Sequence, residues 1–349
     1  MKKVIVTGVT GQVGSYMVEY LLKNTDFKIF GAIRRLSVPN HKNIKHIDDP
    51  RFELIDLDLT DEFSTFSVIQ QIKPDYFINL AANSYVGDSW KMPLHHFDTN
   101  TLGVMRQLES IRKICPKCRY YNAGSSEEFG DVAYTPQDAK HPLRPRSPYG
   151  ASKASARQVV KVWRDSYDLF AIQGWLFNHE SERRGPEFVT RKITKKVAEI
   201  KKAIESDQPF EPLELGNMES KRDWSHAEDF VHGIWLMLNQ ESPKEYVLAS
   251  GETHSVKEFV NIAFKEAEIG DQTLLPKLWW RGEGKELELL YNDTVVVKVN
   301  PKFYRPAEVD LLLGDPKAVT KELKWEKKVD FAKLVSRMVQ HDIKEINAS

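Results

Sequence analysis

The chain has 349 residues, of which 41% are hydrophobic and 29% charged, enough for one large globular domain or two closely packed ones. Its 50 lysines and arginines balance 50 aspartates and glutamates, which argues against broad binding to nucleic acid or membrane surfaces. No apolar stretch approaches the roughly 20 residues of a membrane span, and the run after Met1–Lys3 is too short for a signal peptide. With only two cysteines, we expect a reducing, cytoplasmic setting.

Short apolar runs alternate with helical patterns through the first half of the chain. The apolar runs predict buried strands at Val4–Val6, Lys28–Ile33, Phe52–Ile55, Tyr76–Leu80, Tyr120–Ala123 and Phe170–Phe177. Helical spacing between them predicts helices around Met17–Leu22, Thr101–Lys113 and Tyr149–Tyr167. This alternation is typical of right-handed βαβ units, so we expect an α/β fold with a Rossmann-type, doubly wound parallel sheet.

The pattern changes after the last of these strands. Residues 178–221 are rich in Arg, Lys and Glu and have only scattered apolar positions. A helix near 227–239 and a short strand at Tyr246–Ala249 indicate a return to the sheet. We therefore expect a nucleotide-binding domain and a smaller, discontinuous C-terminal substrate domain. The first comprises residues 1–177 with 222–250, and the second comprises residues 178–221 with 251–345.

A glycine-rich turn follows the first predicted strand and precedes the first predicted helix. Its glycines have the spacing G-x-x-G-x-x-G, which lets backbone N–H groups approach a pyrophosphate at a helix N-terminus. On its own this spacing also fits an ordinary tight turn. In this strand–turn–helix context it predicts dinucleotide binding by Gly8, Thr10, Gly11, Gln12, Val13 and Gly14.

The second predicted strand ends in Arg34-Arg35. An acidic residue there would bind the ribose 2′-hydroxyl of NAD, whereas arginine accommodates the 2′-phosphate of NADP. The pair therefore favours NADP, and the alternative is a solvated basic pair. Asp58-Leu59, after the third strand, is placed to contact the adenine, or is an ordinary turn at a strand end.

Four residues form a candidate catalytic group. Tyr149 and Lys153 lie one helical turn apart, and a nearby ammonium favours the tyrosine phenolate that removes an alcohol proton. Ser125, at the end of a central strand, would hydrogen-bond the same substrate oxygen. Glu127 adds a carboxylate that can remove a proton beside a new ketone and donate one to a departing hydroxyl, which is dehydration. Its neighbour Glu128 is interpreted as a capping or surface carboxylate.

Two other residue pairs are not interpreted as metal-binding or catalytic sites. Cys115 and Cys118 have CxxC spacing, but a structural zinc site needs about four ligands and there is no second cysteine pair, so we predict no metal. His95-His96 has no carboxylate or cysteine partner at ligand spacing and is expected at the surface or at an interface.

Several further stretches give the chain a resemblance to a known family. It resembles the extended short-chain dehydrogenase/reductases, and specifically the GDP-mannose 4,6-dehydratase family, over nearly its whole length. The stretches are Asn178-His179-Glu180-Ser181, Arg183-Arg184-Gly185, Phe188-Val189-Thr190-Arg191-Lys192, Leu215-Gly216-Asn217, Lys221-Arg222-Asp223-Trp224, Tyr304-Arg305-Pro306 and Glu308-Val309-Asp310. They are more specific than the glycine turn or the Tyr149–Lys153 pair, which the whole superfamily shares.

The resemblance implies roles for particular residues. Ser125, Glu127, Tyr149 and Lys153 match the family's catalytic positions, with Ser125 in place of a threonine. Cofactor contacts are implied for Leu80, Tyr149, Lys153, His179 and Arg184. GDP-sugar contacts are implied for Ser84, Asn178, Val189, Lys192, Leu215, Asn217, Arg222, Arg305 and Glu308. Cationic side chains suit a diphosphate, and family assembly implies a homo-oligomer, a dimer or a tetramer.

The chain departs from the family pattern at a few positions. Val13, Glu128, Glu182 and Ser225 stand where the family has aspartate, an apolar residue, proline and glycine. The expected activity is NADP-dependent conversion of GDP-mannose to its 4-keto-6-deoxy product with loss of water. Alternatives are dehydration of another GDP-sugar such as a GDP-manno-heptose, a reductase or 4-epimerase on the same fold, and a non-catalytic NADP-binding scaffold.

Overall fold

A seven-stranded sheet forms the larger part of the computed structural model, which describes residues 1–269, 278–304 and 311–348. The strand order is β11-β6-β5-β4-β1-β2-β3, and every neighbouring pair is parallel. The strands are β1 (Lys3–Thr7), β2 (Lys28–Ile33), β3 (Phe52–Asp56), β4 (Tyr76–Asn79), β5 (Arg119–Ala123), β6 (Ala171–Leu176) and β11 (Val247–Leu248). The order reverses between β1 and β4, so the predicted doubly wound parallel sheet is confirmed.

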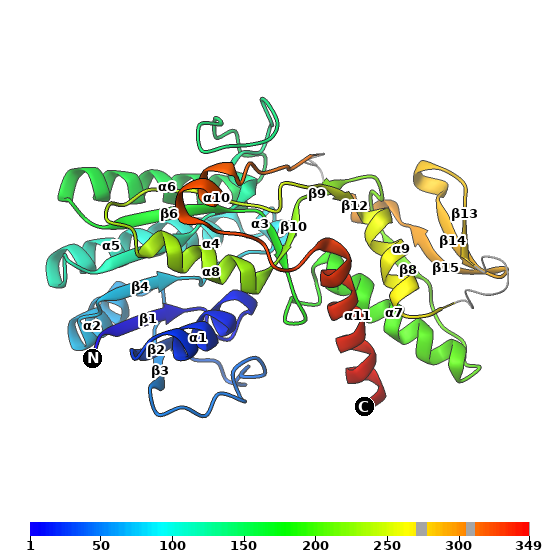
Figure 1. Ribbon diagram of the computed structural model, residues 1–349, viewed down its shortest axis with the longest axis horizontal. Helices are drawn as coiled ribbons and strands as arrows, with labels where there is room; N and C mark the ends of the chain where they lie inside the picture. The colour runs from blue at the N-terminus through cyan, green and yellow to red at the C-terminus, as the bar shows by residue number, and fades with distance from the viewer. Residues whose placement is uncertain (270–277, 305–310, 349) are drawn as a thin grey trace.

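Helices cover both faces of this sheet (Figure 1). On one face α1 (Gln12–Asn24) packs against α8 (Ala227–Leu238), and their apolar stripes share one buried cluster with the sheet. On the other face lie α2 (Glu62–Ile72), α5 (Gly103–Ile114) and α6 (Pro148–Tyr167), joined in a second cluster. Burial on both faces explains why the central strands β1, β4, β5 and β6 are nearly continuous apolar runs.

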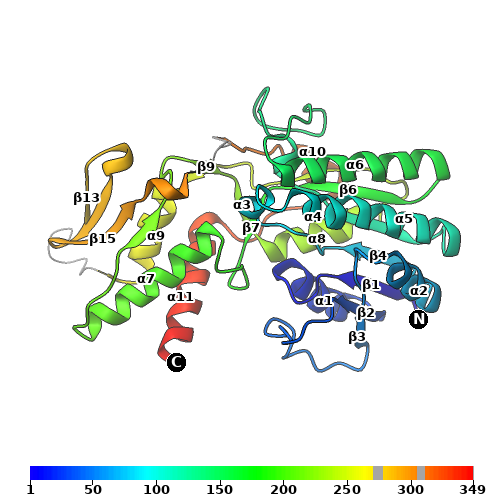
Figure 2. The same cartoon turned by 180° about the vertical axis from the view of Figure 1, so that it is seen from behind.

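A smaller part lies beside the sheet, with its own apolar core (Figures 1 and 2). It packs α7 (Val189–Glu205), α9 (Val256–Glu266) and α11 (Phe331–Ala348) together. Beside these helices is a four-stranded sheet, in the order β13 (Leu278–Arg281), β14 (Glu288–Tyr291), β15 (Thr294–Val299) and β8 (Leu213–Leu215).

The charged stretch at 178–221 contains a long amphipathic helix that composition alone did not reveal. In α7, Ile193, Val197 and Ile200 are fully buried, and their spacing places them on one face of the helix. Lysines and glutamates occupy the exposed positions, and they dominate the composition of the stretch.

The remaining elements are short, and some of them lie at the junction of the two parts. They are α3 (Val86–Ser89), α4 (Pro93–Phe97), a π-helical turn (Asp98–Leu102), a 3₁₀ turn (Ser126–Glu128), β7 (Asn178–Glu180), β9 (Lys221–Arg222), β10 (Trp224–His226), β12 (His254–Ser255), 3₁₀ turns at Gly284–Glu286 and Pro301–Phe303, and α10 (Lys317–Leu323). Parallel pairing of β7 with β10 and antiparallel pairing of β9 with β12 hold the junction together. Across the three described ranges, no helix is both long and apolar enough to cross a membrane.

Candidate active site

A cavity of about 1440 Å³ opens at the carboxyl ends of the central strands, beside the point where the strand order reverses. It continues from the glycine turn to the smaller part of the molecule. The predicted site residues that the structure describes all line it, namely Gly8, Thr10, Gly11, Gln12, Val13, Gly14, Arg34, Arg35, Asp58, Leu59, Leu80, Ser84, Ser125, Glu127, Tyr149, Lys153, Asn178, His179, Arg184, Val189, Lys192, Leu215, Asn217 and Arg222. Arg305 and Glu308 lie outside the described residues.

The glycine turn brings the backbone to the cavity without side chains in the way. Gly8 has φ +69°, and a Cβ added there would lie 2.8 Å from the Ala81 nitrogen. A Cβ on Gly14 would lie 2.1 Å from the Gly8 carbonyl oxygen, so α1 packs directly on the turn. Gly11 caps α1 without a side-chain hydrogen bond. The first N–H groups of the helix are thus left to a ligand in the cavity, which suits a phosphate.

Arg34 and Arg35 follow β2 and are exposed at the cavity wall. Asp58 lies close enough to Arg34 for the two charges to interact. Burial acts to raise the pKa of Asp58, but hydrogen bonds from Thr60, with the charge of Arg34, bring that pKa below its usual value. The end of the cavity beside the glycine turn therefore carries two cationic side chains and one carboxylate held in its ionised form.

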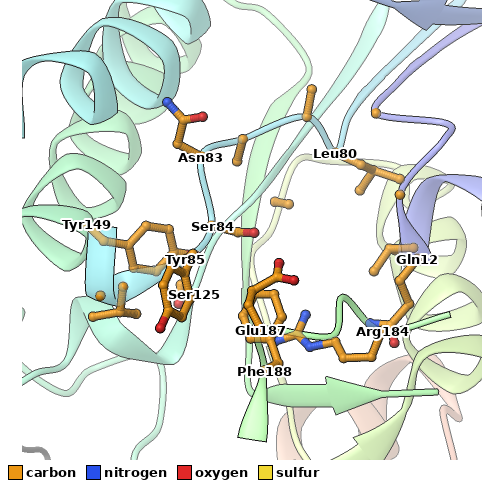
Figure 3. A pocket seen from close by; sticks show the side chains of 18 of the residues that line it. Gln12, Leu80, Asn83, Ser84, Tyr85, Ser125, Tyr149, Arg184, Glu187 and Phe188 are labelled. Atoms are coloured by element: carbon orange, nitrogen blue, oxygen red, sulfur yellow. The ribbon is translucent and has the colours of Figure 1, made fainter. Parts of the chain in front are cut away.

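Capped helical turns position the candidate catalytic group. Tyr149 stands in the first turn of α6, where Pro148 starts the helix and the Ser147 hydroxyl accepts the Gly150 N–H at 3.0 Å. Ser125 caps the turn Ser126–Glu128, and its hydroxyl accepts the Glu127 N–H at 3.2 Å. A hydrogen bond links the Ser125 and Tyr149 side chains. Figure 3 shows these two on one side of the cavity, across from Gln12 and Arg184.

Burial shifts the pKa values of both residues of the pair on α6. Burial raises the pKa of Tyr149 to about 12, and the hydrogen bond to Ser125 opposes this only in part. Burial also lowers the pKa of Lys153 to about 8. The Lys153 ammonium donates to the Ala123 carbonyl at 2.9 Å and lies 6.0 Å from the Tyr149 ring centre. In the protein alone desolvation dominates the Tyr149 pKa, and the help that Lys153 is expected to give the phenolate stays a prediction.

Between the two ends of the cavity, side-chain hydrogen bonds join the elements that form its walls. Gln12 donates to the His179 carbonyl at 2.9 Å and accepts from the Ser181 hydroxyl at 2.7 Å, which joins α1 to β7. Burial, with the charge of Arg184, lowers the pKa of His179 to about 4, so this imidazole is neutral at physiological pH. The Arg184 guanidinium lies 3.5 Å from the Phe188 ring centre.

The far end of the cavity is lined by side chains from α7 and from β8 to β9. Lys192 donates to the Glu214 carbonyl at 2.6 Å and lies 3.6 Å from the Phe303 ring centre. Burial lowers the pKa of its ammonium, opposed by the charge of Glu214. The side-chain oxygen of Asn178 is buried without a hydrogen-bond partner within the described ranges. An unpartnered buried acceptor and a partly desolvated cation fit a polar, anionic ligand.

Some residues of the cavity were not predicted. Tyr85 and Phe188 pack edge to face with ring centroids 5.8 Å apart, and Figure 3 places them with Glu187 between the catalytic side and Arg184. Asn83 and Tyr304 also line the wall. Tyr85 and Asn83 adjoin Ser84 just after β4, and that position at a strand end was the available signal.

His96 corrects a further expectation. It is 2% exposed and packs edge-on to the Tyr149 ring at 6.2 Å, so it is not a surface residue. The short helix α4 lies against α6, and this packing covers the imidazole. Cys115 and Cys118 are free thiols at the end of α5.

The fold matches that of solved structures with bound nicotinamide dinucleotides. A dTDP-glucose 4,6-dehydratase, DesIV from Streptomyces venezuelae with NAD and TYD bound, superposes with a TM-score of 0.81 at 21% identity, covering 99% of this chain and 98% of the other. The structure of RMD from Pseudomonas aeruginosa complexed with NADPH superposes with a TM-score of 0.76 at 19% identity. The match covers 99% of this chain and 100% of the other. At these identities the likeness concerns the fold.

Relatives found by sequence comparison have higher identity to this chain than these structures do. The GDP-mannose 4,6 dehydratase of Drosophila melanogaster is 43% identical over 98% of this chain and 86% of its own length. That of Dictyostelium discoideum is 42% identical over 99% of this chain and 97% of its own. The profile of the family described as GDP-mannose 4,6 dehydratase matches residues 5–338. The chain therefore belongs to the GDP-mannose 4,6-dehydratase family.

Proposed function

We propose that the protein is an NADP-dependent GDP-mannose 4,6-dehydratase, which converts GDP-mannose to GDP-4-keto-6-deoxymannose and water. The observation that carries this proposal is the grouping of Ser125, Glu127 and Tyr149 at one cavity wall. A reductase or 4-epimerase needs a hydroxyl and a tyrosine, but has no use for an additional acid–base carboxylate. Family membership supports the same reaction.

The residues at the glycine turn fit a nicotinamide dinucleotide. A Cβ at Gly8 or Gly14 would collide with neighbouring backbone, and the start of α1 has no side-chain cap, so the turn suits a pyrophosphate. Arg34 and Arg35 make no ion pair in the part of the chain that the structure describes, which leaves them for a 2′-phosphate and favours NADP. When bound, the nicotinamide supplies the hydride acceptor and donor of the reaction.

The chain's own groups then divide the proton transfers. Tyr149 takes the proton of the C4 hydroxyl as C4 is oxidised, and the Ser125 hydroxyl donates a hydrogen bond to the C4 oxygen. The new C4 ketone acidifies the proton on C5. Glu127 removes that proton and returns it to the C6 hydroxyl, which leaves as water. Return of the hydride to C6 and of a proton from Tyr149 to C5 completes the 4-keto-6-deoxy sugar, so neither the cofactor nor the Tyr149 proton is consumed.

A positive charge helps Tyr149 act as a base. Its pKa of about 12 in the buried site is far above neutral pH, so deprotonation needs nearby cations and hydrogen-bond donors. Lys153, whose pKa is about 8, is cationic at pH 7 and stands one turn further along α6. Its charge assists the phenolate once its ammonium turns from the Ala123 carbonyl toward the bound ribose.

The far end of the cavity is suited to the GDP moiety. Lys192 and Arg222 supply cationic donors for the diphosphate, and Asn178 and Asn217 supply amides. Val189 and Leu215 provide apolar contact for the base, and Ser84 adjoins the sugar. In this proposal residues 1–177 with 222–250 bind mainly the cofactor, and residues 178–221 with 251–345 bind mainly the GDP-sugar, whereas Arg222, His179 and Arg184 cross this boundary. A homo-oligomer, dimer or tetramer, is part of the proposal.

The proposal is tested by incubating the purified protein with GDP-mannose and a catalytic amount of NADP⁺. The product mass and the NADPH absorbance are then measured. A product lighter by one water, without steady build-up of NADPH absorbance, is the expected result. Stoichiometric NADPH formation would indicate a simple dehydrogenase. Unchanged GDP-mannose, followed by water loss from another GDP-sugar, would move the proposal to a different hexose or heptose.

A further inference from the structure

Glu128 is a fully buried carboxylate directly behind the catalytic turn, with 0% of its surface exposed. One oxygen accepts the Arg157 Nε–H at 2.5 Å, and the other accepts the backbone N–H of Ser125 at 2.8 Å. The interpretation of Glu128 as a cap is confirmed by this second contact, but it is not a surface residue. A buried charge therefore lies next to the candidate catalytic serine.

The side chain of Gln173, on β6, fixes the carboxylate from a third direction. Its amide nitrogen donates to Glu128 at 3.0 Å and to the Lys153 carbonyl at 3.0 Å. Its amide oxygen accepts from Asn122 at 2.6 Å, so the amide cannot flip without losing three hydrogen bonds. The network therefore connects the turn at Ser125 to the helix that carries Tyr149 and Lys153.

The same chain of amides reaches the glycine turn. Asn122 accepts from Asn79 at 2.7 Å, and Asn79 accepts from the Thr7 hydroxyl at 2.6 Å. Thr7 is the last residue of β1, immediately before Gly8. Buried side chains on four neighbouring strands thus run from the glycine turn to Glu128, and each of their polar side-chain atoms has at least one hydrogen-bond partner, which favours a rigid arrangement.

The Ser125 backbone decides where two reacting groups lie. Ser125 Oγ already accepts the Glu127 N–H, so its hydroxyl can donate its hydrogen, which interacts with Tyr149 in the protein alone, to the substrate oxygen. A rotation of the Ser125 backbone would move this hydroxyl and the Glu127 carboxylate together. The contact from Glu128 to the Ser125 N–H opposes that rotation.

We propose that Glu128 is a positioning residue for the dehydration, an inference that rests on the proposed function. Its carboxylate holds the Ser125–Glu127 turn through the Ser125 N–H, and Arg157 and Gln173 hold the carboxylate in place. Glu128 itself does not touch substrate, because it has no exposed surface and does not line the cavity.

A purely structural role for the Glu128–Arg157 ion pair is the competing explanation. Removing one partner alone would leave an unpaired buried charge and destabilise the protein for either reason. The test therefore uses two double variants in which Arg157→Leu removes the guanidinium in both. Glu128→Gln retains an oxygen that can accept the Ser125 N–H, and Glu128→Leu removes that acceptor.

The two double variants should differ in kcat. With Glu128→Gln and Arg157→Leu, we expect kcat within about threefold of the wild-type value, since the Ser125 N–H is still held. With Glu128→Leu and Arg157→Leu, we expect kcat to fall ~10- to 100-fold, the scale of a misplaced catalytic group. KM for GDP-mannose and the affinity for NADP⁺ should change less than about twofold in both, because positioning acts on the reacting groups.

A remote buried pair supplies the matched control. Asp342 and Arg191 are joined at 2.7 Å and are 1% and 5% exposed, but within the described ranges they make no contact with the catalytic turn. The double variant Asp342→Leu and Arg191→Leu should retain the wild-type kcat, whatever its melting temperature. Melting curves for all three double variants show that the folded enzyme is assayed.

Equal kcat values for the Gln and Leu variants would overturn the proposal and leave the pair a structural one. A fall in kcat of the control that matches the Leu variant would overturn it too, since the loss would then follow any buried pair. If wild-type enzyme fails to dehydrate GDP-mannose, the proposed function has failed instead, so the two failures are distinguishable.

Discussion

The two ends of the cavity are built in different ways. At the glycine turn the walls are backbone, and Gly8 and Gly14 are needed because a Cβ would collide with neighbouring main chain. At the far end the walls are side chains, such as Lys192 from α7 and Arg222 from β9, brought together from separate elements. An end made of backbone is sensitive to added volume, and one made of side chains is sensitive to truncation. Substitutions that add a side chain should therefore impair ligand binding at the first end, and substitutions that shorten a side chain should impair it at the second.

The largest effect is expected where the two ends meet. Glu127→Gln removes the acid–base carboxylate but keeps its size, so water loss should fall by ~10²- to 10⁴-fold while binding of both ligands is nearly unchanged. Product mass and calorimetric affinities for NADP⁺ and GDP measure this. Full dehydratase activity in the variant would contradict the role of Glu127.

At the backbone-built end, one methyl group should be enough to break the site. Gly14→Ala would place its Cβ 2.1 Å from the Gly8 oxygen, whereas Gly11→Ala would place it at 3.2 Å. We expect Gly14→Ala to lower NADP⁺ affinity by ~10- to 100-fold and to destabilise the fold by about 1–3 kcal/mol. Gly11→Ala should do less of both. Equal effects of the two variants in titrations and thermal unfolding would show that packing against Gly8 is not the cause.

At the side-chain end, truncation should act on the sugar nucleotide alone. Lys192→Ala removes a partly buried cation, so the dissociation constant of GDP should rise about tenfold while that of NADP⁺ stays the same. Calorimetry with GDP and with NADP⁺ gives both values. A parallel loss of NADP⁺ affinity would show that the two ends are not independent.

Arg34 and Arg35 are side chains at the end of the cavity that is otherwise built from backbone. Truncating them therefore tests whether a side chain at this end affects cofactor affinity in the way expected of the other end. Arg34→Ala and Arg35→Ala together should weaken NADP⁺ by about tenfold and leave NAD⁺ unchanged, because only the 2′-phosphate is lost as a partner. Cofactor titrations of the double variant test this. A uniform loss for both dinucleotides would argue against a 2′-phosphate site.

The smallest effect concerns pH. Lys153 has a pKa lowered by burial to about 8, so it carries its charge below pH 8 and loses it above. A ligand that binds the ammonium raises its pKa, so affinity for NADP⁺ should be constant below pH 8 and decline above it, up to the higher pKa of the complex. In Lys153→Arg the decline should be absent. Equal slopes in both proteins between pH 8 and 9.5 would assign the titration to another group.

Local patterns predicted the positions of the glycine turn and of the candidate catalytic group. The glycine turn, Ser125 at the end of β5 and the Tyr149–Lys153 helix are each encoded within a few residues, so spacing alone located them. The central strands of the large sheet were predicted for the same reason, since burial on both faces makes their apolar runs nearly continuous.

Features that depend on distant partners were not predicted. Glu128 is buried because Arg157, 29 residues away in sequence, pairs with it. His96 is buried because α4 packs on α6. The far end of the cavity was identified from resemblance, because Lys192 and Arg222 have no shared local pattern. The Tyr149 pKa depends on desolvation, which no sequence spacing reports.

Deuterium at C4 of GDP-mannose tests the central claim most directly. Internal hydride return predicts a product lighter by one water that retains its deuterium, now located at C6, with no labelled cofactor accumulating. A product without deuterium, or label collecting in reduced cofactor, would contradict an intramolecular dehydration at this site.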